Sequence, residues 1–266
     1  MSLQDYFRPE NVSVALDAYA AATSTDRLNW PIPRKLALYA FAKDAFDSNL
    51  GEQQRVQAFD LIYEELRSYW GVFRNPGGGY WDSATVYQTL VSACGPVSRS
   101  SMTLLSARPP RDEARVLGCL RLLRSLKQTT RYPHMAVAKF LHFFNPRLIP
   151  IYDGAVVWQS VLWGRPRRPG AFRSDYTQFC TRRQFRPRED SEQFNWNYLL
   201  LASELMNSTD TAALMRIFAN WVREQADAGT DARVLDELET YYATAFEFIA
   251  IGAAERELTQ RGASGV

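Results

Sequence analysis

Apolar residues recur every three to four positions along most of this chain, which is the spacing of one face of an α-helix. This pattern predicts helices over residues 34–47, 52–70, 112–127, 209–225 and 231–257. Helix starts are indicated by prolines and capping aspartates, at Pro31, Pro33, Asp82 and Asp231. No segment alternates apolar and polar residues for long enough to indicate a β-sheet, and nothing repeats with a period of about 20 to 50 residues. We therefore expect an all-α fold.

A turn between two apolar helices lies near the middle of the chain. The first helix ends at Asn145-Pro146, and a short apolar run over residues 148–152 follows. Asp153 stands directly after this run and before the second helix. Aspartate is a common N-cap, because its carboxylate accepts hydrogen bonds from the free amides of the first turn. A carboxylate among apolar neighbours is also a candidate for catalysis, so both interpretations of Asp153 stay open.

The composition is that of an ordinary globular protein, with 46% hydrophobic and 23% charged residues in a chain of 266. No apolar run approaches the roughly 20 residues that span a bilayer, and Asp5 and Arg8 interrupt the N-terminus where a signal peptide would be apolar. Three widely spaced cysteines without a CxxC pair, with two histidines, do not match the ligand spacing of a closed zinc site, and three cysteines cannot complete a four-cysteine iron–sulfur site. We predict a cytoplasmic protein with no metal, cofactor, membrane or obligate protein partner.

Positive charge is concentrated in residues 163–188, which contain eight arginines and a single acid, Asp175. This segment therefore carries +7, whereas the whole chain carries +2 and the remainder −5. Aromatic residues and prolines separate the arginines, and a guanidinium group binds phosphate as a planar fork. We expect nucleic-acid binding through Arg165, Arg167, Arg168, Arg173, Arg182 and Arg183. A second basic row, from Arg121 to Arg131, is either part of this surface or a solvated helix face.

The order of helix, proline-containing turn, short extended run, aspartate and helix resembles the catalytic element of the helix–hairpin–helix DNA glycosylase superfamily. This superfamily includes endonuclease III and 8-oxoguanine DNA glycosylase. The match covers roughly residues 112–163, rests on spacing and residue type, and implies that Asp153 is the catalytic aspartate. His134, nineteen residues earlier, stands where bifunctional members carry a nucleophilic lysine. The hairpin of the family is glycine-rich, but residues 130–133 contain no glycine, so either Arg131 makes the phosphate contact or the contact is lost.

The resemblance also implies a two-lobed, helical, glycosylase-like fold with a degenerate hairpin. Lobe one would comprise about residues 31–150, and lobe two residues 1–30 together with 151–266, in a single unit over 1–266. The active cleft would lie between the lobes with Asp153 at its floor. Residues 1–30 would pack with the C-terminal helices.

The activity that the resemblance implies is hydrolysis of the N-glycosidic bond of a damaged or modified base, flipped out of double-stranded DNA, to leave an abasic site. A carboxylate beside the flipped nucleotide can stabilise the positively charged sugar and orient a water molecule. Because no lysine stands at position 134, we expect a monofunctional enzyme. Substrate contacts are expected from His134, Tyr152, Trp158, Tyr80 and Trp81. Contacts with the DNA backbone are expected from Arg131 and Lys139.

Some bacterial members of this superfamily act in anti-phage defence and remove glucosylated hydroxymethylcytosine from viral DNA. The arginine-rich segment and the degenerate hairpin favour such an antiviral role over housekeeping repair. Two other classes of function fit the same sequence: a non-catalytic helical nucleic-acid-binding protein, in which Asp153 is only a cap, and a helical scaffold that binds an acidic protein. Core packing stays an alternative for Trp158, a surface position for His134, and a structural role or lyase chemistry for Lys139, whereas His142 is expected in the core.

Overall fold

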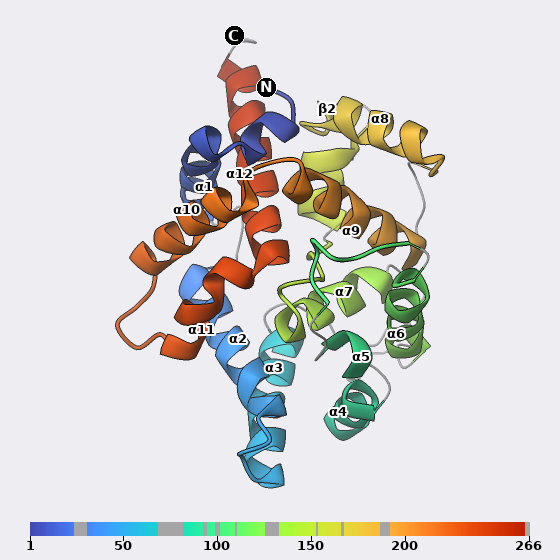
Figure 1. Ribbon diagram of the computed structural model, residues 1–266, viewed down its shortest axis with the longest axis vertical. Helices are drawn as coiled ribbons and strands as arrows, with labels where there is room; N and C mark the ends of the chain where they lie inside the picture. Colours follow the sequence, from blue (N-terminus) through green and yellow to red (C-terminus); the bar gives the residue numbers. More distant parts are fainter. Residues whose placement is uncertain are drawn as a thin grey trace.

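The helices expected from the hydrophobic spacing are present in the computed structural model, which confirms the all-α fold (Figure 1). The structure describes residues 1–23, 31–68, 82–92, 95–98, 102–109, 111–125, 133–152, 154–165, 168–186 and 192–263. Its elements up to the central turn are the 3-10 helix η1 (Gln4–Phe7), α1 (Pro9–Thr23), α2 (Ile32–Phe46), α3 (Glu52–Ser68), α4 (Ser83–Ser92), α5 (Gly95–Ser98), α6 (Glu113–Ser125) and α7 (Pro133–Phe144). After it come the π-helix η2 (Gly154–Leu162), β1 (Gly164–Arg165), β2 (Arg168–Pro169), α8 (Arg173–Arg183), α9 (Glu192–Asn207), α10 (Thr211–Glu224), α11 (Ala232–Glu237), the 3-10 helix η3 (Leu238–Thr240) and α12 (Tyr242–Ala263).

One short ladder departs from the helical pattern of the described residues. Strands β1 and β2 pair antiparallel, with Gly164 opposite Pro169 and Arg165 opposite Arg168. Gly164 has φ 83°, a left-handed conformation that glycine adopts without strain. The ladder is too short to alternate detectably in the sequence, and for this reason the hydrophobic pattern did not indicate it.

The helix expected over residues 231–257 is wrong in one respect, because the chain bends between α11 and α12. Asp231 caps the short α11, with its side chain accepting a hydrogen bond from the Arg233 amide at 2.8 Å. The amides of Ala243 and Thr244, at the start of α12, donate to the carbonyl oxygen of Pro146 at 3.0 and 3.3 Å. Partners from the central turn therefore satisfy free amides that a continuous helix would have bonded internally.

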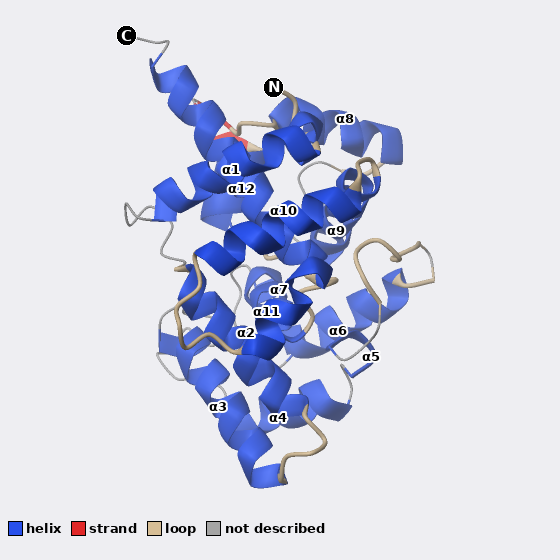
Figure 2. Ribbon diagram, turned by 60° about the vertical axis from the view of Figure 1, so that its left-hand side comes forward, coloured by secondary structure: helices blue, strands red, loops and turns tan. Residues whose placement is uncertain are grey.

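Helix α12 is the centre of the C-terminal half of the molecule, where it packs against α1, α9 and α10 (Figure 1). Residues 243–254 are buried throughout, as expected for a helix that is enclosed on all sides. Helices α2, α3, α4 and α6 lie in the other half, below α12 in Figure 2, and α7 packs against both α2 and α9. None of the described helices is long and apolar enough to cross a membrane.

The N-terminal segment lies against α12, the contact that the resemblance implies for it. The ammonium group of Met1 is 3.0 Å from a Glu257 carboxylate oxygen, and the Tyr6 hydroxyl donates to the same oxygen at 2.8 Å. Helix α1 then crosses α12 at close range along its buried face. The division of the chain into two lobes stays a prediction.

Gly252 sets the distance between α1 and α12. A Cβ atom at this position would lie 1.9 Å from the Ala15 carbonyl oxygen and 3.0 Å from the Tyr19 amide nitrogen. Both atoms belong to the backbone, so no side chain could move aside to make room. The two helices can approach this closely only because residue 252 has no side chain.

We expect Gly252→Ala to lower the free energy of unfolding by at least about 2 kcal/mol, because the added methyl group forces α1 away from α12. Gly118→Ala is the matched control, since a Cβ at this exposed position of α6 meets nothing within 4 Å. Alanine has the better helix propensity, so this control should gain about 0.5–1 kcal/mol. Urea denaturation of both variants measures the difference, and equal stabilities would contradict the close packing.

Candidate active site

The connection between α7 and η2 leads to the candidate catalytic residue. Asn145 anchors its start, because its side-chain amide donates to the Val97 carbonyl oxygen at 2.7 Å. Residues 148–152 are all buried. Asp153 itself lies outside the described residues, and η2 begins directly after it at Gly154. The chain is therefore anchored before and after the position of interest.

His142 ties this connection to two other helices. Its Nδ1 lies 2.6 Å from the Ile149 carbonyl oxygen, which can only accept, so Nδ1 carries the proton. The unprotonated Nε2 then accepts from the Tyr39 hydroxyl at 2.6 Å, and the Tyr39 oxygen accepts from Thr244 Oγ1 at 3.0 Å. Burial and the nearby Lys35 ammonium lower the pKa of His142 to about 3, so the ring is neutral at neutral pH. His142 is thus the core histidine that the sequence favoured.

A buried ion pair lies next to this histidine. Lys35 Nζ is 2.5 Å from Glu247 Oε1, and the two side chains are 1% and 0% exposed. The ammonium group also stands 4.6 Å from the centre of the Phe248 ring, which adds a cation–π contact. Glu247 Oε2 is 3.7 Å from the neutral His142 ring. We call the five residues that meet here the buried polar cluster: Lys35, Tyr39, His142, Thr244 and Glu247.

The sequence analysis missed Lys35 and Glu247. Glu247 stood out only as a single acid inside the apolar run 245–254, and such an acid points to a buried partner. Nothing near Lys35 in the sequence distinguishes it from a surface lysine. The two residues are 212 positions apart, so only the fold brings them together.

Two of the residues expected to contact a base, Tyr152 and Trp158, pack against the same ring, that of Phe194. Tyr152 is 3% exposed, and its ring centre is 4.4 Å from that of Phe194. Trp158 stands edge-on to the same Phe194 ring at 5.1 Å. In this conformation Tyr152 has a packing role, and it could stack on a base only after leaving Phe194.

Trp158 is also the first member of a stack of three side chains. Its indole lies parallel to that of Trp163, with ring centres 5.6 Å apart and planes 11° from parallel. The Arg173 guanidinium covers the Trp163 ring at 4.3 Å. We call Trp158, Trp163 and Arg173 the Trp–Arg stack.

Apart from the exposed Arg186, the other arginines of the basic segment have an acidic partner or lie, at least in their side chains, outside the described residues. Arg182 and Arg183 donate to the two carboxylate oxygens of Glu204 at 2.6 and 2.9 Å. One carboxylate therefore offsets part of their charge. Arg165 and Arg168 belong to β1 and β2, but their side chains, like all of Arg167, lie outside the described part of the chain.

Of the remaining expected site residues, the structure describes the side chain of Lys139 alone. Lys139 is partly buried on α7, and its charge contributes to the lowered pKa of Lys35, whose main cause is burial. His134 lies in the first turn of α7, but its side chain is outside the described residues. The remaining expected residues are wholly outside them: Tyr80, Trp81, Arg131 and Asp153.

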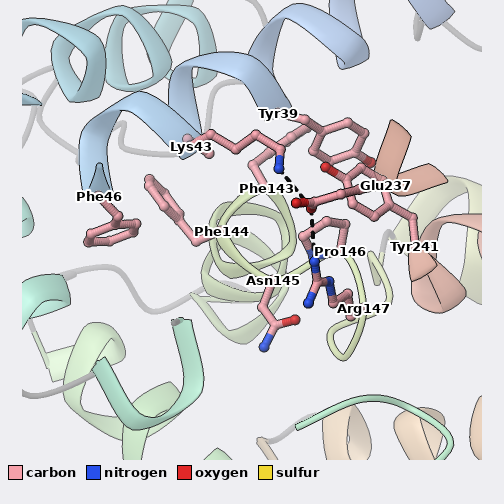
Figure 3. Close-up of a pocket in the computed structure, with 11 residues that line it drawn as sticks. Tyr39, Lys43, Phe46, Phe143, Phe144, Asn145, Pro146, Arg147, Glu237 and Tyr241 are labelled. Carbon is pink, nitrogen blue, oxygen red and sulfur yellow. Dashed lines mark hydrogen bonds and ion pairs between the residues drawn. The ribbon is translucent and has the colours of Figure 1, made fainter. Parts of the chain in front are cut away.

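A surface pocket of about 200 Å³ opens on another side of the buried polar cluster, between α2, the turn after α7 and the bend before α12 (Figure 3). Lys43 and Arg147 converge there on one oxygen of Glu237, at 2.7 and 2.8 Å. Arg233 lies nearby with three acids, and these neighbours are Asp44, Asp47 and Asp231. The two cations that line the pocket, Lys43 and Arg147, are thus already paired with Glu237, and further carboxylates lie beside it, so the pocket is a poor site for a polyanion.

No protein-family model matches the chain, and neither a curated protein nor a solved structure is significantly similar to it.

We expect that removing one partner of the buried ion pair destabilises the protein more than removing both. Lys35→Met should lower the free energy of unfolding by about 3–5 kcal/mol, because it leaves the Glu247 carboxylate buried without its cation. The double variant Lys35→Met, Glu247→Leu should recover most of this loss, since no uncompensated charge is left. Denaturant titration of these two variants and of Glu247→Leu alone measures the recovery, and simple additivity of the two single losses would contradict it.

The neutral state of His142 predicts a specific pH dependence. The pKa is about 3 in the folded protein and ordinarily 6.5, so the unfolded chain binds the proton more readily between these values. The stability that His142 contributes is complete above pH 6.5 and falls by about 1.4 kcal/mol per pH unit as the pH decreases toward 3. In His142→Gln this contribution is absent, so stability should fall less steeply between about pH 6 and pH 4. Equal pH slopes for the two proteins would show that the imidazole is not held neutral.

Proposed function

We propose that the protein is a monofunctional DNA glycosylase that hydrolyses the N-glycosidic bond of a modified or damaged base, with Asp153 as the catalytic carboxylate. The observation that supports this most directly is the anchoring of the chain on both sides of that residue. His142 and the surrounding core hold residues 148–152, and η2 starts at Gly154. A carboxylate that stabilises a transition state has to be held in place by its supporting structure in this way.

The helix after Asp153 adds a second argument. Residues 154–162 form a π-helix, a rare element that often occurs at functional sites. A wider turn changes the direction in which successive side chains leave the helix. Trp158 and Trp163 stack on each other across the end of this element.

The chemistry would follow from the position of one carboxylate beside a flipped nucleotide. The bond between the sugar C1′ and the base nitrogen breaks, and the base leaves with the bonding electrons. Asp153 stabilises the positive charge that develops on the sugar and accepts a proton from the water that bonds to C1′. Because position 134 is histidine, water rather than a lysine amine is the nucleophile.

The remaining features of the proposal come from the sequence. The fold would be a two-lobed glycosylase-like arrangement in which the cleft separates the lobes, and the enzyme would act on double-stranded DNA in the cytoplasm. The arginine-rich segment favours a large modified base, such as the glucosylated hydroxymethylcytosine of phage DNA, over a common repair lesion.

A second candidate function is non-catalytic nucleic-acid binding, with Asp153 acting only as a helix cap. The Trp–Arg stack favours this candidate specifically, since it suits backbone binding and requires no chemistry. The two candidate functions predict the same affinity for DNA, but only the glycosylase is expected to excise a base.

We expect Asp153→Asn to lower the rate of base excision on the order of a hundredfold or more while DNA affinity is kept or increased. Asparagine preserves the shape and the capping hydrogen bonds but removes the negative charge that stabilises the sugar. The assay incubates the protein with duplexes that carry a panel of damaged and hypermodified bases, then applies alkali to reveal abasic sites. Strand cleavage without alkali would indicate lyase chemistry instead.

Asp210→Asn is the matched control, because Asp210 is a described N-cap whose side chain accepts from the Ala213 amide at 3.0 Å. It should leave excision unchanged. A folded Asp153→Asn protein that excises the base at the wild-type rate would leave residue 153 as a cap, whereas a wild-type protein that binds the duplexes and excises none of the bases would favour the non-catalytic function.

A further inference from the structure

We infer that Arg173, whose guanidinium group lies over the Trp163 ring, is a built binding site for a phosphodiester group, and that it rather than Arg182 or Arg183 makes the main backbone contact of the arginine-rich segment. This inference rests on the proposed function for the identity of its ligand, which is DNA. It concerns binding and not catalysis, so it can be tested separately.

The geometry fixes the guanidinium group before any ligand arrives. Its carbon lies 4.3 Å from the centre of the Trp163 ring, and Trp163 is itself stacked on Trp158. Trp158 is edged by Tyr176 at 6.3 Å and by Phe194 at 5.1 Å, both of them buried. A stacked guanidinium keeps its N–H groups at its rim, where they can form the fork that phosphate accepts.

The backbone around Trp163 is also fixed. The Trp163 amide donates to the Trp158 carbonyl oxygen at 2.8 Å, and the Gly170 amide donates to the Trp163 carbonyl oxygen at 3.2 Å. A Cβ atom on Gly170 would lie 2.8 Å from the Leu162 carbonyl carbon, so the ladder is seated directly against the end of η2. The Trp–Arg stack is therefore part of the scaffold and not a loose surface contact.

The charge of Arg173 lacks compensation among the described residues. No carboxylate of the described part of the chain forms an ion pair with it, whereas Arg182 and Arg183 share Glu204. Arg173 also opens α8, where the helix dipole is positive and disfavours a cation, while the other two arginines lie in the last turn, where a cation is favoured. The acid of the segment, Asp175, accepts the Leu3 amide at 2.6 Å. An anionic ligand would supply the charge that Arg173 lacks.

The adjoining ladder adds two more arginines at opposed positions. Arg165 and Arg168 are partners in the register, so the strands beside the stack contribute two further cationic residues. The ligand class is accordingly a nucleic-acid backbone, which presents such groups at regular intervals.

The position of the site suits the proposed reaction. Phe194 contacts both Tyr152, the residue before Asp153, and Trp158, which begins the Trp–Arg stack. Three ring contacts and one cation–π contact thus connect the residue before the proposed catalytic carboxylate with Arg173. A backbone bound at Arg173 would belong to the same stretch of duplex as the flipped nucleotide.

The test measures binding of an undamaged fluorescent duplex as a function of salt concentration. Arg173→Gln should weaken affinity by about tenfold at low salt and reduce the slope of log affinity against log salt by about one phosphate contact. Arg173→Lys keeps the charge but not the stacked fork, so it should keep the slope and still lose affinity. Arg182→Gln is the matched control and should change both quantities little, since Glu204 already offsets that charge.

Unchanged affinity and slope in Arg173→Gln would overturn the inference, as would a larger effect in Arg182→Gln. Tighter binding of polyglutamate than of the duplex, with the same dependence on Arg173, would also overturn it and indicate an acidic protein partner. The excision assay stays independent of these outcomes. If Arg173→Gln leaves DNA affinity unchanged while the wild-type protein excises base, only the proposed binding site is refuted. If Arg173→Gln weakens DNA binding but the wild-type protein excises no base, only the proposed glycosylase activity is refuted.

Discussion

The ion pair between Lys35 and Glu247 is the constraint on which the rest of the structure depends. Both side chains are enclosed in the core, and a buried charge is tolerated only next to its counter-charge and hydrogen-bond partners. The pair therefore requires α2 and α12 to meet at one distance and in one register. His142 stays neutral beside it, since its ring lies near the Lys35 ammonium in a site with little water.

The residues around this ion pair also hold the connection that precedes Asp153 in place. His142 donates to Ile149 and accepts from Tyr39, so α2 and α7 hold that connection jointly. Thr244 adds the start of α12. The other face of α12 is fixed by its close crossing with α1 at Gly252. A segment that the sequence suggests for chemistry is thus supported by three helices far apart along the chain.

Charge is arranged unevenly around this core. Near the pocket of Figure 3, cations and carboxylates nearly balance, and Lys43 and Arg147 both bind Glu237. On the side of α8, Arg173 rests on an aromatic ring and lacks an acidic partner in the described part of the chain. The formal net charge of +2 hides this contrast. Where cations are already paired, a polyanion gains little, and where one is held ready without a counter-charge, it gains most.

The sequence by itself determined the helices and the place of the arginines. Apolar spacing located α2, α3, α6, α7 and α10, because a helix that packs against a core needs one apolar face whatever its neighbours are. The capping signals at Asp82 and Asp231 were equally local. Asp153 too was found from its immediate neighbours in the chain.

Only the tertiary structure decided which of these residues meet. The break before α12 depends on a carbonyl of the central turn, and the role of Gly252 depends on the backbone of α1. The partners of Lys35 and of Arg182 lie on other helices, so no local pattern distinguishes a buried lysine from a surface one, or a paired arginine from an uncompensated one. Periodicity records which face of a helix is apolar, whereas pairing of charges depends on distances between segments that the chain brings together only on folding.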